Sequence, residues 1–255
     1  MRRRQRQDSG TPLTGDLTYR ARIQRFHGKS GKEAIDLKAV IAGNPEKPGK
    51  IHEYRTYVMH PGTLDGYLQL VESKLQPLRQ DRFGRLLGFW YSEFGTLNQV
   101  HHLWEFETLD HRQEQRRLLA HQKSWREEFL EKVLPAIQTQ QINFLRPAIT
   151  VNVPTVVSAF YEMRRYQAVV GKSAQLLQEV LRRPKSSECT LAGVWTSESP
   201  DPNEVLELSA YPDFQSRLEQ GLQQPARCKW AGTVQGLMLG MVSTMLLPAE
   251  ISPLR

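Results

Sequence analysis

Residues 88–98 read G-F-W-Y-S-E-F-G-T-L-N, and residues 193–203 return to this pattern as G-V-W-T-S-E-S-P-D-P-N. Two further blocks repeat in the same order: H52-E-Y-R-T-Y57 matches Y161-E-M-R-R-Y166, and F144-L-R-P-A148 matches M245-L-L-P-A249. Three collinear matches at slowly drifting offsets indicate an internal duplication.

Each copy has the element order of a small unit of helices and strands. In the first copy, apolar and polar residues alternate in a way that predicts strands over residues 52–58, 86–93, 98–106 and 141–146. Apolar residues at helical spacing predict helices over residues 63–83 and 110–137, with Asp110 as the N-cap of the second helix. The order strand, helix, strand, strand, helix, strand is the ferredoxin-like arrangement.

A four-stranded sheet with helices on one face leaves its other face bare, and the duplication supplies a cover for it. We therefore expect an α+β chain of two tandem ferredoxin-like (βαββαβ) repeats, packed sheet to sheet as a pseudo-dimeric α/β barrel. The expected organisation is a basic leader and linker over residues 1–50, a first repeat over residues 51–150 and a degenerate second repeat over residues 155–255.

The positive net charge of +7 comes from the leader alone. Residues 1–50 hold twelve Lys and Arg against five Asp and Glu, so residues 51–255 balance 22 charges of each sign. A neutral body lacks the clustered cations that nucleic acid requires, so we expect no nucleic-acid partner. The Arg-rich leader fits a mitochondrial transit peptide or a disordered tail, and peripheral contact with an anionic membrane is a further expectation for it.

The two cysteines, Cys189 and Cys228, make no disulfide framework and fit no metal or redox spacing, which favours a reducing compartment. The longest uncharged stretch, residues 231–249, has about the length of a membrane span. Glycine, proline, Gln235 and hydroxyl side chains interrupt it, so we predict no transmembrane segment. We also predict no metal site.

The residues quoted so far resemble those of the NIPSNAP family. The resemblance covers about residues 51–255 and rests on E53-Y-R-T-Y-V-M-H-P-G-T63, residues 88–95, N98-Q-V-H-H-L-W104, a helix with Trp125, and M245-L-L-P-A-E-I-S-P-L254. It implies the dimeric α/β-barrel superfamily fold, association with mitochondria, and roles in protein interaction and mitophagy signalling. The superfamily also contains haem-degrading and monooxygenase-type enzymes, so function has to be argued from a site.

Candidate site residues lie on the predicted strands of the first repeat. His101 and His102 are adjacent on a strand and point to opposite faces, so they cannot share one metal ion without a bulge. His102 and Trp104 share a face, and we expect Trp90 of the neighbouring strand to join them. The three side chains form either an aromatic pocket or part of the packed core.

A charged pair recurs in both repeats, as Glu53 with Arg55 and as Glu162 with Arg164. Residues i and i+2 share one face of a strand, so each pair is either an ion pair or an arginine clamp for an acidic ligand. The candidate ligand-binding residues of a cavity between the repeats are therefore Arg55, Tyr57, Trp90, His102, Trp104 and Arg164.

Two functions stay open on the sequence. The first is a non-catalytic interaction or adaptor protein with protein partners and a filled barrel centre, associated with mitochondria in quality control or trafficking. The alternative is a small-ligand or haem-binding, oxygenase-like protein with an open cavity between the repeats. We expect no catalytic residue and no cofactor other than haem. A homo-oligomer and a cytoplasmic location are both compatible with the sequence.

Overall fold

The computed structural model describes residues 49–222 and 224–255. The leader predicted over residues 1–50 lies outside the described residues except for Gly49 and Lys50, so its transit-peptide and membrane-contact roles stay predictions. Among the described residues, no helix is long and apolar enough to cross a membrane.

The first repeat contains four strands and a set of short helices. Its strands are β1 (Ile51–Met59), β2 (Arg85–Ser92), β3 (Gln99–Phe106) and β4 (Ile137–Pro147). Its α-helices are α2 (Leu64–Leu70), α3 (Gln76–Arg79), α4 (Leu109–His121) and α5 (Glu131–Val133). Two π-helical turns (Val71–Leu75 and Trp125–Leu130) and two 3-10 turns (Asp81–Phe83 and Leu134–Ala136) join them.

The second repeat follows the same order of elements with fewer helical segments. Its strands are β5 (Phe160–Ala168), β6 (Thr190–Ser199), β7 (Glu204–Tyr211) and β8 (Met238–Pro248). Its helices are α6 (Ser173–Arg182), α7 (Phe214–Leu222) and α8 (Gln224–Val234).

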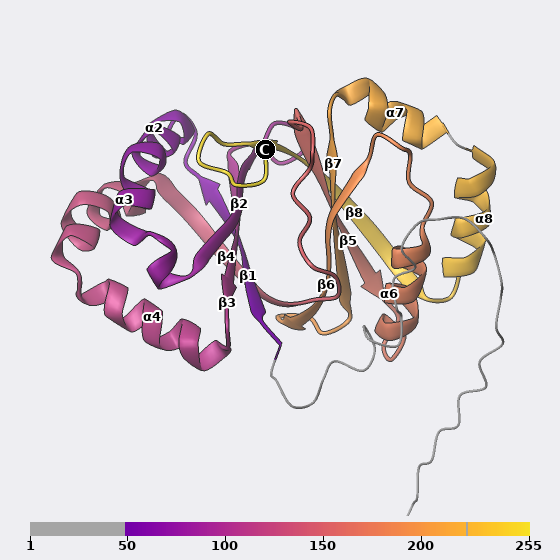
Figure 1. Cartoon of the computed structure of the whole chain (residues 1–255), viewed down its shortest axis with the longest axis horizontal. Coiled ribbons are helices and arrows are strands. Elements are labelled where there is room, and N and C mark those ends of the chain that lie inside the picture. The colour runs from indigo at the N-terminus through magenta and orange to yellow at the C-terminus, as the bar shows by residue number, and fades with distance from the viewer. Residues whose placement is uncertain (1–48, 223) are drawn as a thin grey trace, which may run out of the picture. The chain divides into compact units, whose positions relative to one another are not determined.

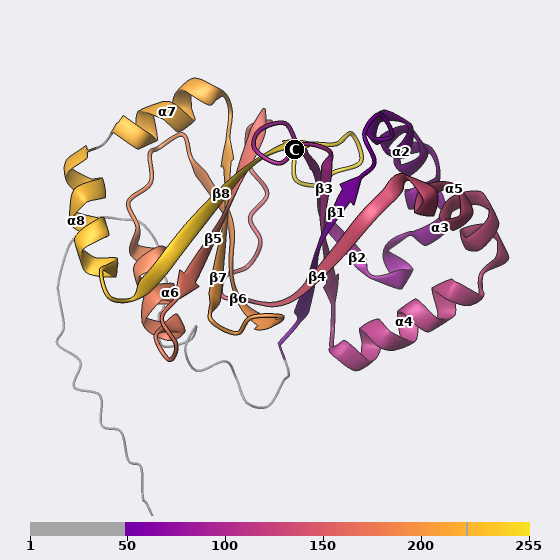
Figure 2. The same ribbon diagram turned by 180° about the vertical axis from the view of Figure 1, so that it is seen from behind.

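The eight strands close into one barrel in the order β1-β3-β2-β8-β5-β7-β6-β4. Each repeat contributes four neighbouring strands, and its helices cover the outer face of its own half (Figure 1; Figure 2). The predicted tandem ferredoxin-like repeats and the pseudo-dimeric barrel are therefore confirmed.

The two seams between the repeats are short. At one seam β2 pairs with β8 only from Trp90 to Ser92, and at the other β4 pairs with β6 only from Phe144 to Pro147. Inside the barrel, the indole Nε1 of Trp195 donates a hydrogen bond of 2.9 Å to Nδ1 of His52, which links the two halves.

Strand alternation divides the apolar residues into three cores. The barrel interior is filled by fully buried side chains from both repeats, among them Tyr54, Trp90, Leu103, Leu145, Tyr161, Trp195, Leu206 and Leu208. A second core lies between the first sheet and its helices, and a third lies in the same place in the second repeat. The helix-side cores and the barrel interior occupy opposite faces of the same strands.

The long helix predicted over residues 110–137 is interrupted, and its predicted N-cap is wrong. Thr108, not Asp110, caps α4, because its extended backbone lets its hydroxyl accept a hydrogen bond of 3.0 Å from the amide of His111. Gln122 is extended and ends the helix. The π-helical turn that follows places Trp125 and Phe129 together in the core, with ring centroids 4.6 Å apart.

The glycine-any-tryptophan pattern of both repeats has a packing reason. The ring of Trp90 lies over the backbone of Gly88, and the ring of Trp195 lies over Gly193 in the same way. A Cβ atom at either glycine would overlap the indole ring. Each glycine also follows a register shift in its strand pairing.

Candidate functional site

Four of the six candidate residues come together in one place. Arg55 and Tyr57 of β1 and His102 and Trp104 of β3 point to the helix side of the first sheet, where they line a cavity of about 250 Å³. Arg55 lies opposite His102 in the strand pairing, and the rings of Tyr57 and His102 meet edge to face at 4.8 Å between centroids. This cavity lies between the sheet and its helices, and not between the repeats as we predicted.

Trp90 does not join this group. It lies opposite His101, while Phe89 lies opposite His102, so Trp90 faces the barrel interior and is fully buried there. The β2–β3 register carries a shift between Leu86 and Gly88, and this shift decides which face of β2 each side chain takes. Arg164 is also separate, because it lies on the helix side of the second repeat.

The cavity of the first repeat is rich in arginine. The carboxylate of Glu53 pairs with Arg112 in a close contact, with Arg55 at 3.2 Å and with Arg116 at 4.0 Å. Arg79 forms no ion pair with a carboxylate of the described residues, and its Nη2 donates a hydrogen bond of 2.8 Å to the carbonyl of Phe83.

The guanidinium of Arg79 lies 3.6 Å from the ring centroid of Trp104, which is a cation–π arrangement. Burial lowers the pKa of Arg79, and the nearby charges of Arg55 and Arg116 act in the same direction. Sequence reasoning missed Arg79, although an arginine stands at the end of the first helical segment of each repeat: Arg79 is the last residue of α3, and Arg183 directly follows α6. That recurrence is the signal that could have found it.

His102 is a neutral hydrogen-bond donor in this environment. Burial, followed by the charges of Arg55 and Arg79, holds the pKa of His102 well below its usual value. Its Nδ1 accepts a hydrogen bond of 2.5 Å from the indole Nε1 of Trp104, so the ring proton is placed on Nε2. His102 Nε2 is buried and has no hydrogen-bond partner in the described part of the chain.

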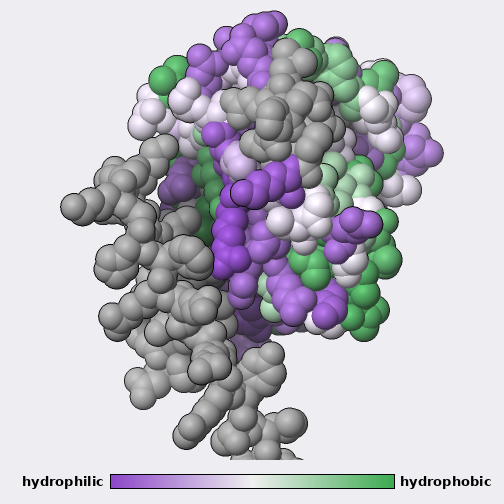
Figure 3. Space-filling view, turned by 90° about the vertical axis from the view of Figure 1, so that its right-hand side faces the viewer, coloured by the Kyte–Doolittle hydropathy of each residue, from purple (hydrophilic) through white to green (hydrophobic). Residues whose placement is uncertain are grey.

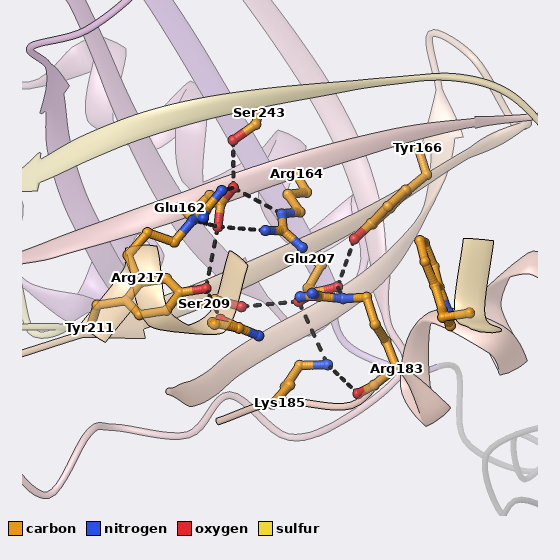
Figure 4. Close-up of polar contacts among 12 residues, drawn as sticks. Glu162, Arg164, Tyr166, Arg183, Lys185, Glu207, Ser209, Tyr211, Arg217 and Ser243 are labelled. Carbon is orange, nitrogen blue, oxygen red and sulfur yellow. Dashed lines mark hydrogen bonds and ion pairs between the residues drawn. The ribbon is translucent and has the colours of Figure 1, made fainter. Parts of the chain in front are cut away.

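In the second repeat the recurrent charged pair is an ion pair (Figure 4). Both oxygens of Glu162 accept hydrogen bonds of 2.9 Å from Arg164, and Arg217 of α7 donates to them at 2.7 and 3.0 Å. Burial alone would raise the pKa of Glu162, but Arg164 and Arg217 lower it to about 2. The partners belong to the same repeat, so the pair does not join the two halves.

A second cavity, of about 640 Å³, lies at one end of the barrel and is lined by strands of both repeats. Its walls include His101, Arg165 and Glu204, and the last two form a two-point ion pair at 3.1 and 2.8 Å. A hydrogen bond of 2.8 Å joins Nδ1 of His101 and the hydroxyl of Tyr54. Burial and the charge of Arg165 lower the pKa of His101 to about 3. Neither Arg165 nor Glu204 was predicted as a site residue from the sequence.

The cavity beside His102 is too small for haem. The cavity beside His102 is smaller than the roughly 300–1,000 Å³ clefts that hold drug-sized ligands. The barrel-end cavity is large enough for such a ligand, and its walls combine polar side chains such as Gln99, Gln141 and Gln167 with apolar ones such as Met163, Met241 and Val242. Within residues 49–222 and 224–255, no group of three His, Cys, Asp or Glu side chains is arranged to hold a metal ion.

Known proteins resemble the chain over most of its length. The family model described as NIPSNAP matches residues 52–150 and 161–253. The human protein NipSnap homolog 3B is 26% identical over 224 residues, which cover 84% of this chain and 89% of that protein. The NipSnap homolog of Dictyostelium discoideum is 26% identical over 215 residues, which cover 79% and 89%.

Solved structures share the fold at low sequence identity. A candidate monooxygenase from Lactobacillus acidophilus aligns with a TM-score of 0.58 at 13% identity, covering 79% of this chain and 95% of that one. An anthrone oxidase-like protein aligns with a TM-score of 0.54 at 9% identity, covering 80% and 94%. At such identities the likeness extends to the barrel architecture alone.

Proposed function

The chain belongs to the NIPSNAP family, and on that premise we propose that it is a non-catalytic interaction protein, an adaptor, associated with mitochondria. The filled barrel centre supports a scaffold more than a reaction chamber, because Trp90, Trp195 and Tyr161 occupy it with no exposed surface. The observation that carries the proposal is the free edge of β8.

Residues 238–245 of β8 pair with β5 along one edge, and no described strand pairs with the other edge. Leu239, Met241 and Val242 on this segment are 71%, 48% and 62% exposed. An exposed apolar strand edge is a template for an added strand, since its backbone N–H and C=O groups are free to pair. The partner we propose is a protein that adds an extended apolar segment to β8.

The equivalent strand of the first repeat differs in chemistry. Residues 137–143 of β4 also pair with a neighbour, β1, along one edge only, but Gln138, Thr139, Gln140 and Gln141 are exposed there. Hydrophobic and hydrophilic residues both reach the surface on the second repeat's side of the molecule (Figure 3). The apolar edge is thus specific to the second repeat, and β4 provides a matched control.

A photocrosslinking residue at Met241 of the full chain, expressed in cells, tests the proposal. We expect one discrete crosslinked protein, whose yield falls at least about tenfold in the Leu239→Lys, Val242→Lys variant, because lysine blocks edge pairing. The same residue at Gln140, and a Gln138→Lys, Thr139→Lys variant, serve as controls. Absence of a discrete product, or a product that persists in the β8 lysine variant, contradicts the interaction role.

The mitochondrial part of the proposal is tested separately by imaging a fluorescent fusion of the full chain. We expect its signal to overlap a mitochondrial marker, and we expect a fusion that lacks residues 1–48 to become diffuse, since the Arg-rich leader would carry the address. A diffuse signal from the full chain contradicts this part and leaves the edge proposal standing.

A second candidate function is favoured by the barrel-end cavity. Its size and its mixed polar and apolar walls suit a small ligand held between the two repeats by Arg165 and Gln141. Mass spectrometry of small molecules released by denaturing the purified protein tests this function. A compound that copurifies with the wild type and is absent from Arg165→Gln supports it, and identical extracts from the two proteins contradict it.

A further inference from the structure

The two repeats provide an internal comparison of one site in two forms. Arg55 lies opposite His102 in the first repeat, and Arg164 lies opposite Glu207 in the second. By the same register, Trp104 corresponds to Ser209. The arginine is retained in both copies, while the residue facing it changes from a carboxylate to a neutral imidazole.

In the second repeat the carboxylate of Glu207 forms ion pairs with the neighbouring side chains of Arg183 and Lys185 (Figure 4). It accepts hydrogen bonds from the guanidinium of Arg183, from the hydroxyl of Tyr166 at 2.9 Å and from the hydroxyl of Ser209 at 3.0 Å. Lys185 adds an ion pair at 3.6 Å. Burial alone would raise the pKa of Glu207, but Lys185 and Arg183 lower it to about 2.

In the first repeat the cations remain and this carboxylate is absent. Among the residues that the structure describes, one acid, Glu53, faces the four arginines Arg55, Arg79, Arg112 and Arg116. The second repeat instead sets two acids against four cations: Glu162 and Glu207 against Arg164, Arg183, Arg217 and Lys185. The first repeat is therefore short of one negative charge.

The unpartnered polar atoms around the cavity are donors. Arg55 Nε, Arg79 Nε and His102 Nε2 are buried without a hydrogen-bond partner in the described part of the chain, and all three residues line the cavity. Arg55 Nε lies within ion-pair distance of Glu53 but in an orientation that makes no hydrogen bond. Buried donors are ordinarily satisfied, so three orphaned donors around one space indicate an anionic group that belongs there.

The rest of the cavity is apolar. Its walls away from the arginines are formed by Leu75, Leu119, Trp125, Phe129, Leu130 and Val133. The volume of about 250 Å³ is about eight times the share of one water molecule in the liquid. Arg116, whose side chain is 38% exposed, lies where the cavity meets solvent.

We propose that this cavity binds a monocarboxylic acid with a compact apolar body of about six to ten carbon atoms, whose carboxylate takes the place that Glu207 holds in the second repeat. The acid group accepts from His102 Nε2, Arg79 and Arg55, and the apolar body lies against Trp125 and Phe129. This site is separate from the β8 edge, and it stands or falls independently of the interaction role.

Isothermal titration of the full chain with sodium octanoate, and with 1-octanol as the uncharged equivalent, tests the proposal. We expect octanoate to bind and octanol to bind at least about tenfold more weakly, because charge-assisted hydrogen bonds hold only the acid. The indole N–H signal of Trp104 in a ¹⁵N-labelled sample, assigned through Trp104→Phe, reports whether the ligand enters this cavity.

The sharpest variant copies the second repeat into the first. In His102→Glu, Trp104→Ser the chain supplies its own carboxylate, so we expect octanoate binding to fall at least about 30-fold, while loss of the buried Trp104 ring lowers the melting temperature and circular dichroism confirms that the variant is folded. Arg79→Leu should weaken binding by a similar factor, and Arg117→Leu, which changes an exposed arginine on α4, should not. Failure of octanoate to bind the wild type, equal binding of octanol, or full binding by the folded double variant would overturn the proposal.

Discussion

Buried charges of the second repeat give the protein an acid-sensitive stability. Glu162 and Glu207 have no exposed surface, and their pKa values in the folded protein are both about 2, because neighbouring cations outweigh the effect of burial. In the unfolded chain the same groups titrate near 4.5. A lowered carboxylate pKa stabilises the fold above the unfolded value, so this contribution is complete above pH 4.5 and is lost as the pH falls toward 2.

The buried histidines His52 and His101 also reduce the stability of the fold as the pH falls, and their effect begins at a higher pH than that of the carboxylates. Burial lowers the pKa of His52 to about 4, and burial with the charge of Arg165 lowers that of His101 to about 3, against 6.5 for a free histidine. The unfolded chain therefore binds these protons first, and the free energy of unfolding decreases once the pH drops below 6.5. Urea denaturation at a series of pH values should show a plateau near neutrality, a decline below pH 6.5 and a steeper one below pH 4.5.

The variant Glu207→Gln shows how much one buried carboxylate contributes to the pH dependence of the unfolding free energy. It should cost about 3 kcal/mol of unfolding free energy at pH 7, because it leaves buried cations uncompensated, and the difference from wild type should shrink toward pH 3. Glu114→Gln, on the exposed face of α4, should follow the wild-type curve. A constant difference across the whole range would contradict the pKa assignment.

Each tryptophan in the barrel interior packs against a glycine, and there is no room for a side chain at that glycine. Gly88→Ala and Gly193→Ala place a methyl group against the rings of Trp90 and Trp195, so each should destabilise the fold by about 1–3 kcal/mol. Near-ultraviolet circular dichroism should change as the indole moves. Gly66→Ala in α2 meets open space and should stabilise the protein by about 0.5–1 kcal/mol, so equal effects at the three sites would refute the packing argument.

At the scale of elements, the start of α4 distinguishes two capping residues. Thr108→Ala removes the hydroxyl that accepts from the amide of His111 and should cost about 1 kcal/mol in chemical denaturation. Asp110→Ala leaves this bond in place and loses only the favourable position of an acid in the first turn, about 0.3–1 kcal/mol. If Asp110→Ala lost more unfolding free energy than Thr108→Ala, Asp110 would be the N-cap after all, as the sequence predicted.

Element order could be read from the sequence, because alternation and helical spacing are local properties. The opposite directions of His101 and His102 followed from their adjacency alone. The face taken by Trp90 could not be read, since it depends on the register between β2 and β3 and on a shift at Gly88. The break at Gln122 was also hidden, because apolar spacing continues to Trp125 and Phe129 across it.

Four of the six candidate residues lie together, and their cavity is not the one predicted between the repeats. Arg55, Tyr57, His102 and Trp104 do line one cavity, as their shared parity on paired strands requires. Alternation along a strand predicts which residues share a face of the sheet. It does not predict which face packs against the helices and which faces the other repeat. Arg79 reaches the same cavity from the end of α3, and no strand pattern could reveal that approach.

For the whole molecule, closure of the barrel depends on both repeats being present. The inner face of the first sheet carries Tyr54, Trp90, Leu103 and Leu145, which the second repeat covers. A fragment of residues 49–153 would expose these side chains, so we expect it to self-associate into a dimer that rebuilds the barrel. Sedimentation equilibrium at several concentrations, beside residues 49–255 as a control, measures this. A folded and strictly monomeric fragment would show that the inner face needs no cover.

Because the two halves are parts of one chain, they can differ in sequence, which the subunits of a symmetric homodimer cannot. In a protein built from two identical subunits, every substitution appears twice, so a change that helps one copy is imposed on the other. Here a codon change alters one half only, and the exchange of His102 for Glu207 at matching positions is a difference that such a gene can keep. One half can therefore keep an imidazole at this position while the other half keeps a carboxylate that neutralises its own cations.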